Sequence, residues 1–553
     1  MAEVRTGGDV VVESLTALGA TTVFGIPGQH ALAMYDAVRR SPLRHVGSRV
    51  EHNAVFAADG HARATGEVGV VLLSTGPGAL LSLGALQEAY AACVPLVVVT
   101  SQVPRRGLGG VRTGHLHQLD DQQASARNVT KSTTLVRDAA AIPGALARAW
   151  ALAQQAPAGP TWVEVPEDVL RGPAGTPRVT TLDADPGLPL APRPEVTAEA
   201  ASLLASAERP VLLAGGGVRR SPGGPQALVR LAELLDAPVV SSVGGKGAIG
   251  FDHPLSAASW IEDRHTTDLL ADADVLLAVG TSLGEVTSNY ETLRPQGRVV
   301  QVDAEPRVLG SNHNVLGVPA DAAAALTALA EALADAPRPP GRRPGAEVAA
   351  RLRREVEARL AAQDLGTEQR LLADLREAVP DPADTFWDMT IAGYWAWSAW
   401  DPRGGGWHTA EASGGLGLAL PAAVGAALGT GRRTLAVSGD GGAMYGVSEL
   451  AAARQHDADV TWLVVDDGGY GILREYMDDA FGAASSTELH RPDFRALAES
   501  FGVPAYDATL ETVGDLIART FDPTSGLRGP VVVVLPALLR MFAPTHLTTP
   551  EEA

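Results

Sequence analysis

Two loops rich in glycine and aspartate carry the residues best suited to bind an anion together with a metal ion. The apolar run 434–438 ends in Gly-Asp-Gly-Gly at 439–442, and the apolar run 460–465 ends in Asp-Asp-Gly-Gly-Tyr-Gly at 466–471. Glycines let the backbone approach a phosphate, and the N-terminus of a following helix favours an anion. A carboxylate beside a phosphate would repel it unless a cation lies between them. Asp440 therefore indicates a hard metal such as Mg²⁺, which prefers oxygen ligands.

Either loop alone would be an ordinary end to a strand in an α/β protein. Asp440 and Asp467 are 27 residues apart, which leaves room for a crossover helix supplied by the run GVSELAAARQ. Adjacent parallel strands would then bring the two loops side by side. The pair at this spacing favours a binding site over two unrelated turns.

The elements that must position these loops follow one pattern along the whole chain, in which short β-branched runs alternate with Ala- and Leu-rich stretches. We expect strands at 69–74, 96–100, 210–214, 275–279, 298–302, 434–438, 460–465 and 530–535. Continuous apolar strands separated by helices indicate parallel sheets covered on both faces. Ligands bind such sheets beyond the carboxyl ends of the strands, where both loops lie.

Two segments rich in proline and glycine divide the chain into three parts, and each part predicts a doubly wound α/β domain. We expect domains at 1–172, 196–334 and 361–545, with linkers at 173–195 and 335–360.

Composition excludes several classes of protein. The formal net charge of −20 would repel a nucleic acid backbone, and the single cysteine, Cys93, excludes an intrachain disulfide and a cysteine-based metal site. The N-terminus lacks the pattern of a signal peptide, and apolar runs fall short of the roughly 18 residues that a membrane span needs. We expect a cytoplasmic protein that binds neither nucleic acid nor membrane.

The stretch 434–476 resembles the thiamine diphosphate motif, a Gly-Asp-Gly followed some thirty residues later by Asn-Asn. The resemblance implies that the side chains of Asp440 and Asp467 and the backbone carbonyl of Gly469 are the metal ligands. This chain has Asp466-Asp467 in place of Asn-Asn. A second anionic ligand should hold Mg²⁺ more tightly, but it also repels the diphosphate.

A second segment, 410–425 (AEASGGLGLALPAAVG), resembles the part of these enzymes that holds the aminopyrimidine ring. The resemblance implies that the backbone at Gly414 and Leu416 binds the edge of the ring, and that the Leu416 side chain forces the bent conformer of the cofactor. Asp388 and Thr390 match a further loop that contacts the cofactor. The alternative interpretation of 410–425 is a glycine-rich start of a helix.

Glu51 is the candidate catalytic residue of the first domain. The flanking runs FGIPGQH (24–30), ADGHARATG (58–66), STGPGALLSLGAL (74–86) and VPLVVVTSQVP (94–104) match, in order, the acetolactate-synthase-like branch. That resemblance implies that Glu51 bonds the pyrimidine nitrogen, a role that needs a buried carboxyl able to carry a proton. Without these flanking runs, Glu51 would be interpreted only as an acidic residue in the first turn of a helix, where it interacts favourably with the helix dipole. The branch usually reads His-Glu-Gln here, where this chain has Val50-Glu51-His52.

The residues implied by the resemblance form two sets. The catalytic candidates are Glu51, Gln29, His115, His117 and Gln118. The cofactor candidates are Glu51, Pro27, Thr75, Asp388, Thr390, Gly414, Leu416, Gly439, Asp440, Gly441, Gly442, Asp467, Gly469, Tyr470, Gly471 and Ile472. His117 and Gln118 align with a Phe-Gln pair in acetolactate synthases and a His-Glu pair in many relatives. Each histidine could equally be a solvated loop residue, and we expect His30 and His61 to pack or to face solvent.

Other residues bear on the substrate. Leu473 stands where pyruvate decarboxylases have a glutamate. At this position the chain resembles benzoylformate decarboxylase and benzaldehyde lyase instead. Trp395, Trp397 and Trp400 are either plain core or the lining of a bulky substrate pocket. The run LLAGGGVRR is a weak dinucleotide signal, and we expect no FAD.

These observations predict a thiamine-diphosphate- and Mg²⁺-dependent 2-oxo acid decarboxylase or carboligase. The family builds each site between the first domain of one subunit and the third domain of another, so the resemblance implies a homodimer or homotetramer. Two alternatives stay open: an acyloin lyase or synthase of benzaldehyde-lyase type, and a noncatalytic paralogue that binds the cofactor.

Overall fold

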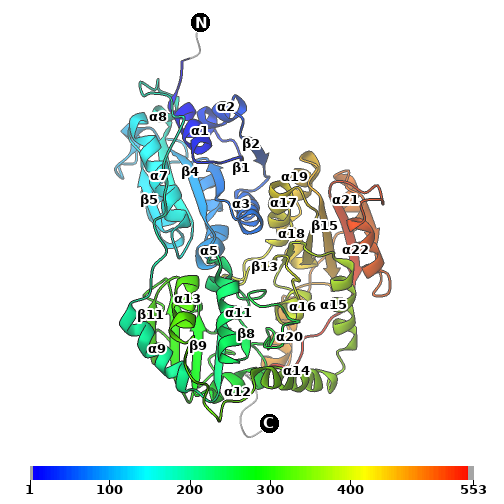
Figure 1. Cartoon of the computed structure of the whole chain (residues 1–553). Coiled ribbons are helices and arrows are strands. Elements are labelled where there is room, and N and C mark those ends of the chain that lie inside the picture. Colours follow the sequence, from blue (N-terminus) through cyan, green and yellow to red (C-terminus); the bar gives the residue numbers. More distant parts are fainter. Residues whose placement is uncertain (1–3, 546–553) are drawn as a thin grey trace. The chain divides into compact units, whose positions relative to one another are not determined.

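Three parallel β-sheets with helices around them make up the computed structural model, which describes residues 4–545 (Figure 1). The predicted α/β fold with three parallel-sheet domains is confirmed. Contacts between Cα atoms divide the chain into two units. Unit 1 contains Met1–Gly187, Ala383–Thr390 and His408–Ala537, and unit 2 contains Leu188–Pro382, Ile391–Trp407 and Leu538–Ala553.

The first sheet has the strand order β2-β1-β3-β4-β6-β5 and belongs to unit 1. Its strands are β1 (Thr22–Gly25), β2 (Arg44–Gly47), β3 (Gly69–Leu73), β4 (Leu96–Gln102), β5 (Ser132–Leu135) and β6 (Thr161–Pro166). The helices between them are α1 (Gly7–Ala17), α2 (Leu32–Arg39), α3 (Glu51–Thr65), α4 (Pro77–Leu81), α5 (Leu83–Ala91), α6 (Gln122–Ala126), α7 (Ile142–Gln154) and α8 (Glu167–Arg171), with short 3-10 turns at Gln29–Ala31, Arg105–Gly107, Arg127–Val129 and Ala139–Ala141. Strands β3, β4 and β6 are buried along their whole length, as expected for a sheet covered on both faces.

The second sheet has the order β11-β10-β9-β7-β8 and lies in unit 2. Its strands are β7 (Pro210–Ala214), β8 (Val239–Ser241), β9 (Val275–Val279), β10 (Arg298–Asp303) and β11 (Val315–Pro319). Its helices are α9 (Pro194–Ser206), α10 (Gly216–Arg220), α11 (Gly224–Leu235), α12 (Arg264–Asp272) and α13 (Ala322–Ala332), and α14 (Gly345–Ala361) and α15 (Gly366–Ala378) follow.

The third sheet has the order β13-β12-β14-β15-β17-β16. Its strands are β12 (Thr385–Trp387), β13 (Trp407–Thr409), β14 (Thr434–Gly439), β15 (Val460–Asp466), β16 (Ala505–Asp507) and β17 (Val531–Pro536). The helices of this part are α16 (Ile391–Ala399), α17 (Ala419–Thr430), α18 (Asp440–Gly446), α19 (Glu449–Gln455), α20 (Gly471–Phe481), α21 (Phe494–Ser500) and α22 (Val513–Phe521).

Within unit 1, helices α3 and α17 lie against each other and join the first and third domains (Figure 1). Their backbones are almost in contact: a Cβ at Gly60 would lie 2.0 Å from the Ala422 carbonyl oxygen, and a Cβ at Gly425 would lie 1.8 Å from that of Ala57. Helix α17 is buried over 419–427, as expected for a helix that is apolar on every side. This crossing fixes the start of α3, where Glu51 lies, relative to the segment before α17.

The second predicted linker differs from the structure in its second half. Residues 345–361 form helix α14, which buries Ala349, Leu352, Val356 and Leu360 along one face. This spacing of three and four residues is the helical period, and it outweighs the preceding Pro- and Gly-rich run. The predicted domain boundaries themselves stay predictions.

Candidate functional site

The two aspartate loops lie next to each other at the carboxyl edge of the third sheet. Strands β14 and β15 pair in parallel with Gly439 opposite Val465. Helix α18 begins at Asp440, directly after β14, and Asp466 ends β15. The predicted adjacency of the loops is therefore present in the fold, because the two strands that precede them are neighbours in register.

At this edge the Asp440 carboxylate is buried and the Asp467 carboxylate is half-buried. Both Oδ atoms of Asp440 and Oδ1 of Asp467 accept no hydrogen bond from the described residues, and Asp440 is only 2% exposed. Burial raises the pKa of Asp440, and burial together with the nearby charge of Asp440 raises the pKa of Asp467 to about 7. A buried and a half-buried carboxylate side by side, with three oxygens that accept no hydrogen bond, suit a divalent cation with oxygen ligands. Residues 4–545 hold no group of three or more His, Cys, Asp or Glu side chains able to bind a metal.

Two glycines shape the second loop. Gly469 has φ +157°, and a Cβ there would lie 2.0 Å from the Thr487 carbonyl oxygen. A Cβ at Gly471 would lie 1.8 Å from Oδ2 of Asp467. A larger residue at either position would displace the Asp467 carboxylate or the backbone around the Gly469 carbonyl.

Two arginines that the sequence did not point to neutralise part of the Asp466-Asp467 charge. Arg491 donates to Oδ1 of Asp466 at 2.8 Å, and Arg474 donates to the Asp467 carbonyl at 3.2 Å with its guanidinium 3.9 Å from Oδ1 of Asp467. No local pattern links Arg491 to a loop more than twenty residues earlier. The positive charges of Arg474 and Arg491 reduce the repulsion that is expected between the Asp466-Asp467 pair and a diphosphate.

The predicted ring-holding segment connects β13 to α17. The buried carboxylate of Asp388 accepts a hydrogen bond from the Ala419 amide at 3.0 Å, at the start of α17. Burial raises the pKa of Asp388 to about 6. Thr390 lies beside Gly439, since a Cβ on Gly439 would be 3.3 Å from its methyl group. Asp388 therefore has a structural role, because it holds the segment between β13 and α17 in place. The predicted contact of Asp388 with the cofactor is separate from this role.

Glu51 is the first residue of α3 and is half-buried. Its Oε1 would be 3.1 Å from a Cβ on Gly78, so the carboxylate faces the loop 74–78. Thr75 in that loop is fully buried and donates to Oε1 of Gln122 at 2.6 Å. The Glu51 carboxylate therefore faces the stretch of chain that contains Thr75, and the roles assigned to both residues stay predictions.

The histidine candidates form a cluster with a residue that was expected only to pack. The rings of His30 and His117 are 5.4 Å apart, and Nε2 of His30 is 3.9 Å from Glu167. Burial lowers the pKa of His30, and the positive charges that His117 and His115 can carry lower it further. Of the two expected alternatives for His30 and His61, packing or facing solvent, the structure shows packing, since both side chains are buried.

The remaining catalytic candidates differ in their surroundings. Gln118 uses its side-chain amide within its own loop, donating to the carbonyls of Gly107 and Val111 at 2.8 and 2.9 Å. This favours a structural role. Gln29 and Pro27 are exposed, and Ile472 is buried while Leu473 is 49% exposed.

The tryptophan cluster belongs to the core of unit 2. Trp395 packs edge-on against Trp260 and Phe542, and Trp400 lies under the guanidinium of Arg376. The side chains of Trp395, Trp397 and Trp400 are each at most 3% exposed. Their packing favours the core interpretation over a substrate pocket.

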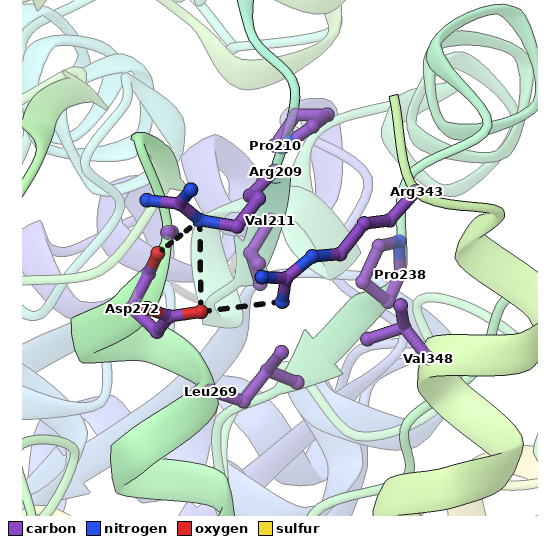
Figure 2. A pocket seen from close by; sticks show the side chains of 9 residues that line it. Arg209, Pro210, Val211, Pro238, Leu269, Asp272, Arg343 and Val348 are labelled. Carbon is purple, nitrogen blue, oxygen red and sulfur yellow. Dashed lines mark hydrogen bonds and ion pairs between the residues drawn. The ribbon is translucent and has the colours of Figure 1, made fainter. Parts of the chain in front are cut away.

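The glycine run of unit 2 that the sequence singled out is closely packed. A Cβ at Gly215 would lie 2.1 Å from the Gly280 carbonyl oxygen, so this glycine of the run LLAGGGVRR serves close packing. A hollow beside β7 is lined by Arg209, Asp272 and Arg343, which bond one another (Figure 2). It measures about 20 Å³, roughly the space of one water molecule. None of the predicted cofactor residues lines it.

Three family models match the chain in order. They are the N-terminal binding domain (residues 5–125), the central domain (197–329) and the C-terminal binding domain (388–535) of thiamine pyrophosphate enzymes. The chain belongs to the thiamine pyrophosphate enzyme family.

Relatives narrow the class. The chain is 34% identical over 503 residues to a Pseudomonas aeruginosa protein named "Probable 2-ketoarginine decarboxylase", covering 90% of this chain and 88% of that protein. It is 30% identical over 522 residues to a "Probable acetolactate synthase large subunit" of Methanocaldococcus jannaschii (90% and 87%), and 29% identical over 524 residues to the acetolactate synthase isozyme 1 large subunit of Escherichia coli (92% and 90%). The chain is thus a thiamine-diphosphate-dependent 2-oxo acid decarboxylase or carboligase acting on a small molecule. Across residues 4–545, no helix is long and apolar enough to cross a membrane.

Proposed function

We propose that the chain binds Mg²⁺ through Asp440, Asp467 and the Gly469 carbonyl, and that this ion anchors the diphosphate of the cofactor. The observation that carries this proposal is that both oxygens of the buried Asp440 carboxylate and Oδ1 of the half-buried Asp467 carboxylate have no hydrogen-bond partner among the described residues. A divalent cation would compensate both charges and bridge them to phosphate oxygens. Arg474 and Arg491 keep the additional negative charge of this loop compatible with an anionic ligand.

Thiamine diphosphate, when bound, supplies the nucleophilic carbon and the electron sink for loss of CO₂ from a 2-oxo acid. The protein supplies positions and protons. We assign Glu51 to hold a proton at the pyrimidine nitrogen, and the backbone at Gly414 and Leu416 to hold the edge of the ring. His115 and His117 are the candidates to move a proton at the substrate carbonyl. Gln29 remains a candidate contact to the substrate.

The metal is tested with the apo protein. Quenching of tryptophan fluorescence by thiamine diphosphate is measured with Mg²⁺ and with EDTA, for wild type and Asp440→Ala. We expect Mg²⁺ to strengthen binding at least about tenfold in wild type and to have no effect in the variant, because the bridging ligand is lost. Mg²⁺-independent binding in wild type would refute the proposed metal site.

The substrate is tested by measuring CO₂ release from a panel of 2-oxo acids. The panel should include acids with aliphatic, aromatic and guanidinium side chains, because one relative is named for 2-ketoarginine and Leu473 replaces the glutamate of pyruvate decarboxylases. Decarboxylation of at least one acid, with aldehyde or acyloin as the product, is the expected result. Cleavage of an acyloin to aldehyde without CO₂ would favour the lyase alternative instead.

The proposal includes the assembly. Because Glu51 and the metal loop come from different domains, we propose that a homodimer or homotetramer completes each site, in a cytoplasmic protein.

A further inference from the structure

The segment between Glu411 and Leu416 has no regular secondary structure, and its shape depends on contacts from elsewhere. It follows β13 and leads into α17, and Gly414 has φ +67°. Residues 411–416 are exposed or half-buried, whereas 417–427 are buried. Asp388 holds the far end, where its carboxylate accepts a hydrogen bond from the Ala419 amide and lies beside the backbone of Gly417 and Leu418. The part proposed to bind the ring therefore needs other supports.

Glu88 of helix α5 supports the first half of the segment. Its Oε2 accepts hydrogen bonds from the Ser413 amide and hydroxyl, both at 2.8 Å, and from the Ala412 amide at 3.3 Å. The side chain of Glu88 is fully buried. A carboxylate that accepts two successive backbone amides sets the direction of the chain at this point.

The other oxygen of Glu88 belongs to a buried ion cluster. Arg63 of α3 lies 3.4 Å from Oε1 of Glu88, and it also donates to Asp59 at 2.6 Å. The ordinary interpretation of such a cluster is packing between α3 and α5. That interpretation accounts for Oε1 but leaves the three donors on Oε2 unexplained, since all three come from the segment of the third domain.

His52 of helix α3 supports the second half. Its ring packs edge-on against Phe56, with centroids 4.5 Å apart, and burial lowers the pKa of the ring while the nearby Leu416 carbonyl acts in the opposite direction. The buried ring of Phe56 would be 3.6 Å from a Cβ on Gly415. His52 stands where the related branch has glutamine, so the residue that departs from the pattern is the one that reaches Leu416.

We propose that Glu88 and His52 are positioning residues that set residues 412–416 in the conformation that binds the aminopyrimidine ring. The proposal rests on the proposed function, which gives Gly414 and Leu416 the contacts to the ring. Glu88 and His52 touch neither the cofactor nor the substrate, and they act through the backbone that they hold.

The test compares two ligands of the apo protein in the presence of Mg²⁺. Thiamine diphosphate needs both the ring segment and the metal loop, whereas inorganic pyrophosphate needs only the metal loop. Loss of one supporting contact should weaken thiamine diphosphate about tenfold in Glu88→Gln and in His52→Leu, while pyrophosphate binds as in wild type. Glu67→Gln, an exposed glutamate, is the matched control and should change neither affinity.

Two further variants separate positioning from general damage. His52→Gln keeps an N–H able to reach the Leu416 carbonyl, so it should bind thiamine diphosphate within about twofold of wild type. Ser413→Ala combined with Glu88→Gln should be less harmful than the sum of the two, because both remove the same contact. Hydrogen exchange of the 412–416 amides in the apo protein should quicken in Glu88→Gln.

Three outcomes would overturn the inference. Equal weakening of both ligands would mean that the variants only damage the fold. Unchanged thiamine diphosphate binding with faster exchange at 412–416 would mean that Glu88 holds a segment that does not contact the ring. A wild-type chain that binds neither ligand with Mg²⁺ would refute the proposed function, and this inference with it.

Discussion

At the scale of single residues, the site depends on buried carboxylates whose charges must be balanced. Both oxygens of Asp440 and Oδ1 of Asp467 accept no hydrogen bond from the described residues, Asp466 is paired with Arg491, and Glu88 shares its two oxygens between Arg63 and the 412–413 backbone. The partners differ in kind: a metal ion as proposed for Asp440 and Asp467, a surface arginine for Asp466, and backbone amides with a buried arginine for Glu88. A substitution that removes one negative charge should therefore have an effect specific to its partner.

The Asp467→Asn variant tests the departure from the family pattern. We expect Mg²⁺ affinity to fall about tenfold, since one charge of the ligand set is lost, while repulsion of the diphosphate decreases. Calorimetric titration of the apo protein with Mg²⁺ in the presence of thiamine diphosphate measures the Mg²⁺ affinity that results from these two effects. Asp466→Asn is the control, because its carboxylate is bound by Arg491. An equal loss in Asp466→Asn would show that the ligand positions are assigned wrongly.

Glu88 should make stability depend on pH. Burial raises its pKa from 4.5 to about 7, so the unfolded chain releases this proton at a lower pH than the folded protein. The stabilisation is complete below about pH 4.5 and is lost as the pH rises to 7. Glu88→Gln should reduce the difference in unfolding free energy between these two pH values by about 1–3 kcal/mol, measured by urea denaturation. A pH dependence equal to that of wild type would contradict the assigned shift.

At the scale of elements, the crossing of α3 and α17 determines where Glu51 and the ring segment lie. The helices approach so closely because glycines stand at 60 and 425, with no room for a methyl group. Helix α3 begins with Glu51 and continues with His52, so one rigid element carries a catalytic candidate and a positioning residue. A change that separates the helices should disturb both.

Gly425→Ala measures the tightness of this crossing. Alanine normally stabilises a helix relative to glycine, but here its Cβ would lie 1.8 Å from the Ala57 carbonyl oxygen. We expect a net loss of about 1–3 kcal/mol in thermal or urea unfolding. Gly366→Ala, in helix α15 with open space around it, is the control and should be neutral or slightly stabilising. A stable Gly425→Ala protein would mean that the two helices can move apart at little cost.

At the scale of the whole molecule, the open question is which copies of the chain build one site. If the first domain of one subunit completes the third domain of another, two inactive variants can complement each other. A mixed dimer would then have one site with both defects and one intact site. If each site lies within one chain, no mixture can be active.

Glu51→Gln and Asp440→Ala are the variants for this experiment. Each alone should lose turnover by about 100-fold or more, the range for a lost proton-transfer group or its equivalent. Unfolding and refolding an equal mixture should restore about a quarter of wild-type activity, since half of the dimers are mixed and each has one of two sites intact. Recovery no greater than that of the separate variants would refute a shared site, and full activity of Glu51→Gln alone would refute its catalytic role.

The amino-acid sequence by itself determined the long apolar strands, the three parallel-sheet parts and the two aspartate loops. These depend on local periodicity and on glycines at strand ends, so strands 210–214 and 275–279 begin and end where expected. The sequence also placed Asp440 and Asp467 together, because neighbouring parallel strands end at one edge.

Only the tertiary structure decided which distant side chains support these loops. The pairs Glu88–Ser413 and Arg491–Asp466 join residues that no periodicity relates, as does the approach of Phe56 to Gly415. Helix α14 likewise occupies residues 345–360 of the predicted linker, because one face of this helix is buried in the folded protein. Local propensity selects the elements, but their partners depend on how helices such as α3 and α17 pack, and that packing is a property of the whole folded chain.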